Sequence, residues 1–489
     1  MNDCVIIYLY RFDASAPSIK RKRLTYFMKK KEIPYKLYDI IPSQETMYLM
    51  VKYSFHKQLT QIPTSFTVDA DFDFDLLQKA FNIELQRNDS LRIRFVSDGK
   101  KLKQYFLPEL TYKVPVMHFS SFEEQDAYFS EDAQKPVYFL KDETFRIVFY
   151  KTDGVGSGIY FNVSHLNVDA MGIVVMYYDL IRIYFALKKN EPLPEPLDKY
   201  EDYIKEEFDR LADEKKMKKH EDFYKKYFLK GGEPFYAGVH GPAFLEKARK
   251  KAKNPNLRVP AAYNPIYDKC DTIEKHIDPE SSKKILDFCL ARRIAPESLL
   301  QLGLRTHCSK INYRTPDVFM MSLCSKRASK KEKNMSGCLT QPLQLRTIIP
   351  EDYTFEQALS EITSVRTQLF MHSAYPYITA RDMSRDIYDY NLIQGPACMM
   401  FSWIPVPIVP DSKYNIDFKT YNLGRYFTPL YVISTPNPKT RGIDMHYMYR
   451  VKLSTPGDIE ALHANAVKVV LEGIENPDIT IGELLDSIS

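Results

Sequence analysis

The most informative segment of the chain is residues 158–172, which read Gly158-Ile159-Tyr160-Phe161-Asn162-Val163-Ser164-His165-Leu166-Asn167-Val168-Asp169-Ala170-Met171-Gly172. The apolar run Gly158 to Val163 predicts a buried strand. Residues 164–170 predict a loop, and the apolar run from Met171 to Lys189 predicts a long helix that ends with two lysines and Asn190. A loop held between a strand and a helix is a rigid support for polar side chains, so we look for chemistry there.

Two residues of this loop, His165 and Asp169, lie four positions apart, just before the positive end of the predicted helix. A neutral imidazole near pH 7 is a suitable base or hydrogen-bond acceptor for an incoming amine or hydroxyl. A lone histidine more often packs or caps than catalyses, so this evidence is weak by itself. Asp169 has two interpretations: a carboxylate that orients the histidine, or a structural anion that is paired with an arginine and fixes the loop. We favour the second.

The segments on either side of this loop predict further regular elements. Asp73 or Asp75 can cap a helix whose apolar residues recur every four positions, and residues 88–90 end it. The alternating segment Leu91 to Phe95 then predicts a strand. After the long helix, the proline-rich segment Glu191 to Pro196 cannot continue a helix, and we place a boundary between two lobes there.

The C-terminal part of the sequence also mixes helices and strands. Helices are expected at Pro279 to Arg293, Pro296 to Ile311, Thr354 to Met371 and Pro456 to Leu471. Strands are expected at Val318 to Cys324, near Leu339 to Ile349, near Met399 to Ile408, at Tyr431 to Ser434 and at Asp444 to Val451. This mixture favours α+β layers in each half.

The composition is that of an ordinary soluble globular protein. Of the 489 residues, 44% are hydrophobic and 27% are charged, which excludes disordered, collagen-like and coiled-coil chains. Asp179 and Arg182 interrupt the longest apolar run, so no membrane span is expected. The N-terminal segment, with Asp3 and an apolar run cut short by Arg11, does not resemble a secretory signal, and we expect the protein in the cytoplasm.

The cysteines and the charged residues limit the kinds of metal and macromolecule that this protein is expected to bind. The seven cysteines are dispersed and form no Cys-x-x-Cys pair, which argues against a disulfide framework and against a zinc site. A net charge of +5 does not by itself indicate nucleic acid. The basic runs at residues 20–23, 215–219, 247–253 and 326–333 are either solvated surfaces or a docking face for an acidic protein.

Residues 164–170 resemble the His-His-x-x-x-Asp-Gly motif of condensation domains from nonribosomal peptide synthetases, whose fold is shared with chloramphenicol acetyltransferase. Further segments match the motifs of that family in the same order. They are Tyr38 to Gln44, Arg87 to Phe95, Tyr200 to Tyr203, Gly337 to Arg346, His372 to Tyr377, Arg381 to Arg385, and Glu475 to Leu484. Each match is loose alone, but together they extend over residues 37–489.

The resemblance implies an α+β fold of two chloramphenicol-acetyltransferase-like lobes, arranged in a V with a central tunnel. Residues 1–36 would be a leader segment packed on the N-terminal lobe. Residues 37–190 would form that lobe and carry the His-x-x-x-Asp loop, and residues 191–489 would form the C-terminal lobe. Such a protein would be a free-standing condensation domain that meets its acyl-loaded carrier protein as a separate chain.

The resemblance also implies the chemistry. His165 would face the reacting groups and help to join a carrier-bound acyl or aminoacyl thioester to a free or carrier-bound amine. The donor would arrive on a phosphopantetheine arm as co-substrate, with no metal and no permanently bound cofactor. Two positions depart from the motif, namely Ser164 and Ala170, and alanine is acceptable only if its φ angle is negative.

Three further residue roles are hypotheses. Gly172 would let backbone N–H groups approach the developing oxyanion. Asp169 would pair with Arg346, with Arg92 or Arg94 as weaker candidates. Lys326, Arg327 and Lys330 would receive an acidic carrier protein or the phosphate of its arm.

Two other functions remain open at this stage. The same motif serves N- and O-acyltransferases that use acyl-coenzyme A, so the product could also be an ester. Ser164 and Ala170 also allow a catalytically silent domain that docks carrier proteins. An epimerase is less favoured, because no second acidic motif for proton return is evident. The acyl chain, the acceptor and the oligomeric state are not readable from the sequence.

Overall fold

The structure is a computed structural model that describes residues 33–99, 101–141, 143–263, 268–405, 416–437 and 439–489. The chain divides into two compact units, Met1–Lys36 and Leu37–Ser489, and the description below concerns the second. The apolar run before Arg11, the basic run at residues 20–23 and the packing of the leader segment lie outside the described residues. The division at residues 190 and 191 stays a prediction.

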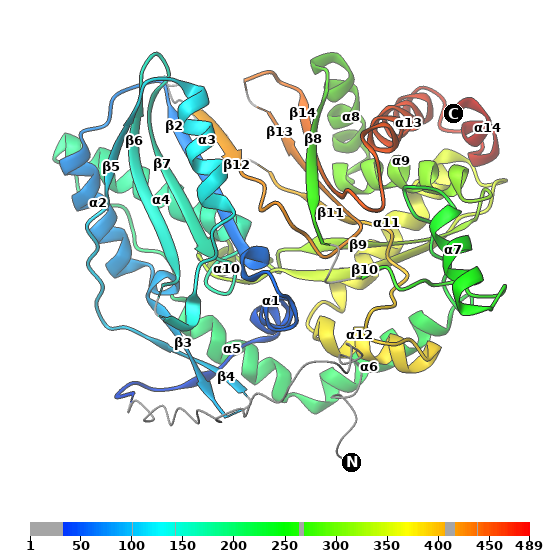
Figure 1. Cartoon of the computed structure of the whole chain (residues 1–489), viewed down its shortest axis with the longest axis horizontal. Helices are drawn as coiled ribbons and strands as arrows, with labels where there is room; N and C mark the ends of the chain where they lie inside the picture. The colour runs from blue at the N-terminus through cyan, green and yellow to red at the C-terminus, as the bar shows by residue number, and fades with distance from the viewer. Residues whose placement is uncertain (1–32, 100, 142, 264–267, 406–415, 438) are drawn as a thin grey trace, which may run out of the picture. The chain divides into compact units, whose positions relative to one another are not determined.

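A five-stranded sheet carries the His165 loop (Figure 1). Its strands, in spatial order, are β12 (Ile416–Thr420), β2 (Gln61–Val68), β7 (Gly156–Ser164), β6 (Phe145–Thr152) and β5 (Val116–Phe119). Side chains of β7 alternate between its faces, because Phe161 packs with the cluster under helices α2 (Phe74–Arg87) and α4 (Ala170–Lys189), whereas Tyr160 stacks on Phe129 of α3 (Phe122–Ala133). The expected strand and long helix on either side of His165 are both present.

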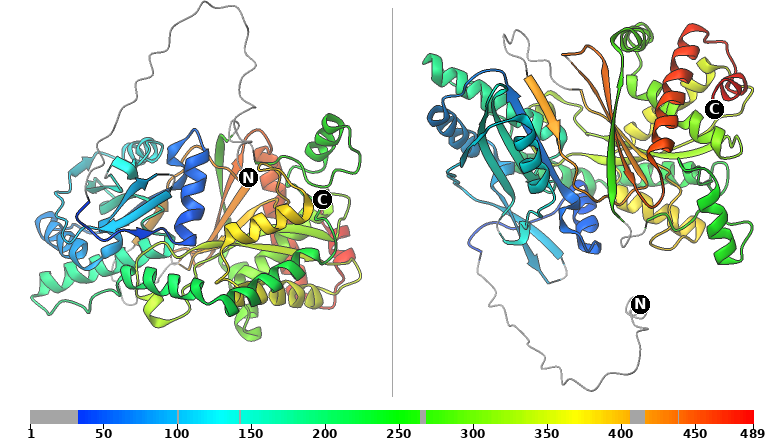
Figure 2. Two further views of the ribbon diagram at one scale, coloured as in Figure 1. Left: turned by 90° about the horizontal axis from the view of Figure 1, so that it is seen from below. Right: turned by 45° about the horizontal axis from the view of Figure 1, so that its top comes forward.

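Strand β12 comes from the C-terminal half of the sequence but completes this N-terminal sheet (Figure 2, right). It runs antiparallel to β2, with Phe418 opposite Phe66 and Thr420 opposite Thr64. The sequence analysis missed this strand, because its five residues are only half-buried and show no strong alternation. The two halves of the chain are thus joined by main-chain hydrogen bonds as well as by side chains.

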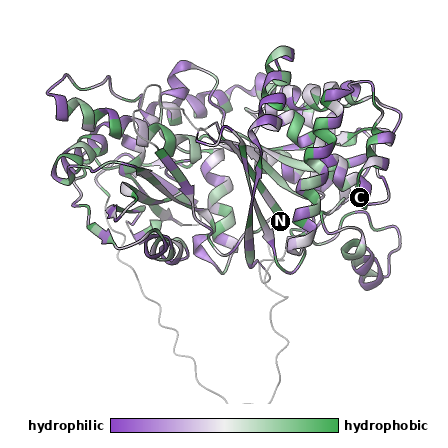
Figure 3. Ribbon diagram, turned by 90° about the horizontal axis from the view of Figure 1, so that it is seen from above, coloured by the Kyte–Doolittle hydropathy of each residue, from purple (hydrophilic) through white to green (hydrophobic). Residues whose placement is uncertain are grey.

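A six-stranded sheet forms the centre of the C-terminal half. Its strands, in spatial order, are β10 (Gln341–Ile348), β9 (Asp317–Cys324), β11 (Met400–Trp403), β13 (Leu430–Pro436), β14 (Ile443–Arg450) and β8 (Cys270–Ile277). Helices α8 (Pro279–Arg292), α9 (Pro296–Ile311), α11 (Phe355–Met371) and α13 (Pro456–Glu475) contribute residues to the largest core cluster with this sheet. Figure 3 shows that hydrophilic and hydrophobic residues alternate along the helices of this half.

The remaining elements surround these two sheets. A small sheet has the order β1 (Tyr38–Asp39), β4 (Lys101–Phe106) and β3 (Ile93–Asp98). The remaining helices are α1 (Pro42–Tyr53), α5 (Tyr200–Ala212), α6 (Glu214–Leu229), α7 (Ala243–Ala252), α10 (Lys330–Lys333), α12 (Tyr377–Tyr388) and α14 (Ile481–Ser487). Short 3-10 turns occupy Lys57–Thr60, Asp89–Arg92 and Phe139–Lys141.

Most predicted elements are confirmed within a few residues, because local signals define their ends. The Asp73 carboxylate accepts a hydrogen bond from the Leu76 N–H at the start of α2, and Thr354 caps α11 in a capping box. Asn190 ends α4 in the left-handed conformation that a C-cap requires. The strand expected from Leu91 starts only at Ile93, because residues 89–92 form a 3-10 turn.

Helix α4 is long and apolar enough to cross a membrane by length and composition, although half of its most apolar window is buried inside the protein. One side, with Ile173, Met176 and Leu180, belongs to the core beside α2. Another side, with Ile181 and Phe185, lines a cavity. Helix α4 is therefore unusually apolar because two of its sides face apolar surroundings within the protein.

Candidate functional site

Backbone hydrogen bonds fix the loop that carries His165. The N–H of His165 donates to the Thr60 carbonyl at 2.7 Å, and the N–H of Ser164 donates to the Thr144 carbonyl at 2.8 Å. The Ser164 hydroxyl accepts a hydrogen bond from the Leu166 N–H at 3.3 Å. Serine at this departure from the family motif therefore stabilises the loop from within.

His165 as a residue is only partly buried, although Leu166 and Asn167 beside it are fully buried. Burial lowers the pKa of His165 from its ordinary value of 6.5, and the Asp169 carboxylate opposes this shift. The ring is therefore neutral at pH 7. Its Nδ1 lies 3.9 Å from the Cys338 sulfur, a thiol whose pKa burial raises well above its ordinary value. The arrangement leaves a neutral base on the loop.

The Asp169 carboxylate holds three segments of the chain together. Its Oδ1 accepts the Gly172 N–H at 2.7 Å and so caps α4. Its Oδ2 accepts the Arg327 guanidinium at 2.7 Å and the Leu339 N–H at 2.8 Å. The N–H of Asp169 also donates to the Gly337 carbonyl at 3.0 Å. This geometry supports the structural interpretation of Asp169, as an anion paired with an arginine.

The predicted partner of that ion pair was wrong. Arg346 binds Asp317 through two hydrogen bonds of 2.7 and 2.8 Å, and Arg92 and Arg94 donate to backbone carbonyls. Arg346 is too far from Asp169 to form this ion pair. The Asp169 carboxylate binds the backbone at Leu339, and Arg346 lies seven residues later on a nearly extended strand, which corresponds to about 20 Å.

The N–H of Gly172 is bonded to the Asp169 carboxylate at 2.7 Å, so this N–H is not free for an oxyanion, and the hypothesis about the neighbouring backbone N–H groups stays a prediction. A Cβ atom at position 172 would lie 2.9 Å from the backbone N and O of Gly337. Glycine is therefore required by the close approach of that segment. Ala170 begins α4 and is not among the residues with positive φ, so the condition for alanine there is met.

The docking surface predicted at Lys326, Arg327 and Lys330 is contradicted for two of its three residues. Lys326 is buried and pairs with Glu207 at 2.6 Å. Arg327 is buried beside Asp169. These two cations are already neutralised inside the fold, so only Lys330 is exposed to a partner.

Two other matched motifs meet behind the His165 loop. The Asp89 carboxylate accepts the N–H groups of Tyr200 and Glu201, each at 2.9 Å, and so caps α5. The Tyr200 hydroxyl donates to the Cys338 carbonyl at 2.9 Å. Tyr200 and Tyr203 are buried in one cluster, as expected for packing residues. These groups support the loop from behind.

The first motif supports the same loop from another side. The Gln44 amide donates to the Leu166 carbonyl at 2.9 Å, and the Asn167 amide donates to the Ser90 carbonyl at 2.9 Å. All four residues are largely buried. The sequence analysis matched the segments of Gln44 and Ser90 to family motifs, but it gave these residues no role, because their partners lie 122 and 77 positions away.

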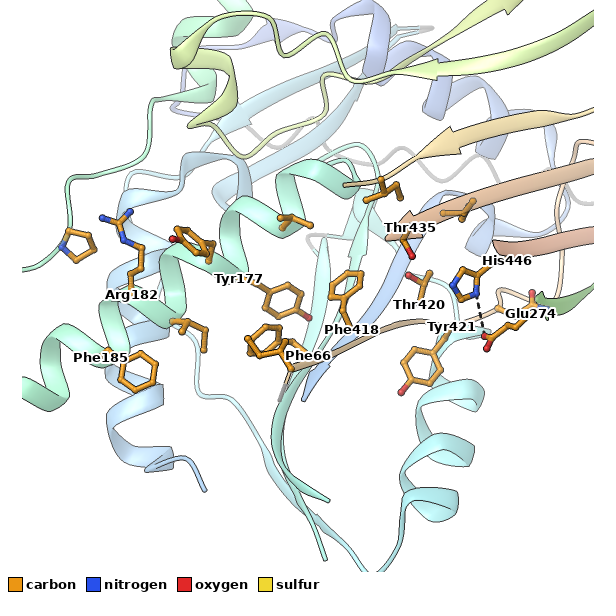
Figure 4. Close-up of a pocket in the computed structure, with 18 of the residues that line it drawn as sticks. Phe66, Tyr177, Arg182, Phe185, Glu274, Phe418, Thr420, Tyr421, Thr435 and His446 are labelled. Atoms are coloured by element: carbon orange, nitrogen blue, oxygen red, sulfur yellow. Dashed lines mark ion pairs between the residues drawn. The ribbon is translucent and has the colours of Figure 1, made fainter. Parts of the chain in front are cut away.

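A cavity of about 460 Å³ lies between α4 and strands of both large sheets (Figure 4). One wall is the outer side of α4, with Val174, Tyr177 and Phe185, and a second consists of strands β2 and β12, with Phe66 and Phe418. The third wall is the face of β8, β13 and β14, with Thr272, Thr435 and His446. His165 itself is not among the lining residues.

Comparison with known proteins identifies the class. A family model described as the condensation domain matches residues 35–387. A plipastatin synthase of Bacillus subtilis (strain 168) is 22% identical over 424 residues, which cover 85% of this chain and 15% of that protein. Bacitracin synthase 3 of Bacillus licheniformis is 20% identical over 460 residues, which cover 91% of this chain and 7% of that protein. This chain therefore spans a small part of the length of these relatives.

Solved structures show the same fold. The first condensation domain of the calcium-dependent antibiotic synthetase, in complex with a substrate analogue, gives a TM-score of 0.73 at 14% identity, covering 92% of this chain and 98% of that one. A variant of the starter condensation domain of rhizomide synthetase, in complex with C8-CoA, gives 0.75 at 13% identity, covering 91% and 97%. The chain belongs to the condensation-domain family, and the predicted α+β, chloramphenicol-acetyltransferase-like fold is confirmed.

Replacement of Asp169 tests its structural role. Asp169→Asn should lower the free energy of unfolding by about 3–5 kcal/mol, because the buried Arg327 charge loses its counter-charge. Chemical denaturation followed by circular dichroism measures the loss. The matched control is Asp71→Asn, an exposed carboxylate 3.0 Å from Lys151, which should cost about 1 kcal/mol or less. An Asp169→Asn protein as stable as the control would favour the orienting role instead.

Two glycines in the first turns of helices make a second test. Gly172→Ala should destabilise the protein by about 1–3 kcal/mol, because its Cβ would collide with the Gly337 backbone. Gly457→Ala in α13, where the nearest atom is 3.8 Å from the added Cβ, should be neutral or stabilising. Melting temperatures of the two variants give the comparison. Equal melting temperatures would contradict the close contact at Gly172.

Proposed function

We propose that this protein joins a carrier-bound acyl or aminoacyl thioester to an amine and so forms an amide bond. The observation that carries the proposal is the neutral His165 imidazole on a loop fixed by backbone hydrogen bonds, in a chain of the condensation-domain family. A neutral imidazole is the form that accepts a proton.

In the proposed reaction, the amine nitrogen attacks the thioester carbonyl carbon. A C–N bond forms, the C–S bond breaks, and the thiolate leaves. His165 takes the proton from the attacking nitrogen and returns a proton to the leaving sulfur. Because Nδ1 faces Cys338 and the loop backbone, Nε2 is the atom assigned to this transfer. Orientation of the two reactants can supply about 7–11 kcal/mol, and proton transfer about a hundredfold or more in rate.

We infer that the donor arrives on the phosphopantetheine arm of an acyl-loaded carrier protein, with a free or carrier-bound amine as acceptor. We place this reaction in the cytoplasm. All six cysteines among the described residues are free and buried, which fits a reducing compartment. The proposal involves neither a nucleic acid partner nor a membrane-spanning segment.

A second candidate donor is acyl-coenzyme A. The observation in its favour is that the starter condensation domain of rhizomide synthetase, which has the same fold, was solved with C8-CoA. Coenzyme A carries the same pantetheine arm as a carrier protein, so both donors present the same thioester. Product formation from matched carrier-bound and coenzyme A thioesters, followed by mass spectrometry, separates the two.

Removal of the imidazole tests the catalytic role. His165→Ala should lower kcat by about 10²- to 10⁴-fold with an unchanged circular dichroism spectrum, because the proton acceptor is lost. The control is His118→Ala, an exposed histidine paired with Asp153, which should keep full activity. A His165→Ala enzyme with wild-type turnover would exclude His165 as the base.

The lowered pKa of His165 makes a separate prediction about pH. The rate requires the unprotonated ring, so kcat/KM should fall with decreasing pH, with a midpoint below 6.5. The sign follows from burial, which disfavours the charged imidazolium and keeps the base form populated at lower pH. The pH profile of a single-turnover assay measures this limb. Once the rate is expressed per unprotonated acceptor amine, an acid limb centred above 6.5 would contradict the assignment.

A further inference from the structure

We infer that His220 and His372 form a binding site for one divalent copper or nickel ion between α6 and the C-terminal end of α11. The inference goes beyond the proposed function, because the ion is assigned no step in amide bond formation. It rests on the distance between two imidazole nitrogens, on the groups that hold each ring and on the charges around them.

The first observation is that the two imidazole rings direct a nitrogen at each other. Nδ1 of His220, on α6, lies 2.9 Å from Nδ1 of His372, the C-cap residue of α11. The two ring planes stand at 89°, and both residues are partly exposed. Only one of the two nitrogens can donate a hydrogen bond in this contact, so the other presents a lone pair.

Three other histidines that reach solvent have a different kind of partner. His118, His276 and His446 each lie against a carboxylate, at 2.7, 2.7 and 3.3 Å respectively. A carboxylate favours the protonated imidazolium, whereas a metal ion binds the neutral imidazole. A contact between two imidazoles is therefore the better arrangement for a metal ion.

The second observation is that the separation of the nitrogens matches one coordination geometry. With metal–nitrogen bonds of about 2.0–2.1 Å, two neighbouring ligands lie roughly 2.9 Å apart in a square-planar or octahedral site and about 3.3 Å apart in a tetrahedral one. The Nδ1–Nδ1 distance of 2.9 Å agrees with the first arrangement. Copper and nickel favour square-planar or tetragonal sites with nitrogen and oxygen ligands, whereas zinc favours tetrahedral ones.

The third observation is that packing holds both ligands in place. The His372 ring stacks on Phe223 of α6, with ring centroids 3.8 Å apart and planes 4° apart. The His372 N–H donates to the Gln368 carbonyl at 3.1 Å. On α6, the Tyr227 hydroxyl donates to the Gln344 carbonyl of β10 at 2.7 Å, which fixes this helix against the sheet. Ligands that two packed helices hold in this way need little rearrangement to bind an ion.

The binding step leaves the number of protons unchanged. In the metal-free pair, one ring carries its proton on Nδ1 and donates it to the other ring. When the ion binds, this proton moves to Nε2 of the same ring through water, and both Nδ1 atoms offer lone pairs. Two metal–nitrogen bonds then replace one hydrogen bond between the rings.

One nearby charge opposes the ion. Burial and the positive charge of Lys219 lower the pKa of both rings, so both are neutral at pH 7. The same lysine repels a cation, so the site is weaker than two histidines alone would make it. The Lys218 ammonium, by contrast, is paired with Glu221 and Asp222, each at 3.1 Å.

Water completes the coordination. Glu221 and Asp222 are engaged with Lys218, and the described part of the chain holds no group of three or more His, Cys, Asp or Glu side chains placed for a metal. Two protein ligands and several water molecules make an exchangeable site, in contrast to a permanently bound cofactor. The bound ion would link α6 to the end of α11.

The test measures binding of the metal alone to the full chain, prepared without a histidine tag. Calorimetric titrations with CuCl₂ and with NiCl₂ should each show one ion at the strongest site, and copper should bind more tightly than nickel. Electron paramagnetic resonance of the protein with one equivalent of Cu²⁺ should show coordination by two imidazole nitrogens. MgCl₂ should not bind there, because magnesium prefers oxygen ligands.

Variants locate the site. His220→Ala and His372→Phe each remove one ligand, and the phenyl ring of the second keeps the stack on Phe223. Each should weaken copper binding at least tenfold and remove one nitrogen from the copper spectrum. If one variant does not fold, the other decides alone, because each leaves a single imidazole. The control is His118→Ala, which removes an exposed histidine and should bind copper as the native chain does.

Two results would overturn the inference. One is the absence of copper and nickel binding in the native chain, and the other is the same affinity and copper spectrum in the native chain and in each folded variant. In either case the contact between the two rings would be a hydrogen bond alone. Neither result would affect the proposed function, which the His165→Ala enzyme tests separately.

Discussion

The rest of the site depends on the buried Asp169 carboxylate. It caps α4 through Gly172, neutralises Arg327 and accepts the Leu339 N–H, so it joins segments that are up to 170 residues apart in the sequence. A buried ion pair with good geometry is costly to break from one side, because the remaining charge has no water to solvate it. The position of His165, four residues earlier, therefore follows from an interaction in which the histidine takes no direct part.

The supporting groups explain why the family motifs are dispersed along the chain. Asp89 caps α5 and thereby positions Tyr200, whose hydroxyl donates to the carbonyl of Cys338, the residue whose sulfur lies 3.9 Å from the imidazole. Gln44 holds the carbonyl of Leu166 from another direction. A short loop has few contacts of its own, so its rigidity has to come from side chains supplied by distant segments. Most matched motifs of this protein are supports for one loop.

Local sequence signals predicted the helices and strands well. They predicted poorly which residues far apart in the sequence pair with each other. Helix ends such as Thr354 and the strand before Ser164 were predictable, because caps and apolar runs act over a few residues. The pairing of Asp169 with Arg327 spans 158 positions, and Arg346 was an equally basic alternative. Strand β12 was missed, because its pairing with β2 depends on chain that lies about 350 residues away in sequence.

Helix α4 connects the loop to the cavity, and this connection has a structural consequence. Its N-terminus is capped by the residue that fixes the loop, its inner side belongs to the core, and its outer side borders the cavity. A helix that is packed in this way cannot shift to adapt to a ligand without disturbing both the cap and the core. The position of the His165 loop relative to the core is therefore fixed by the same packing that stabilises the fold.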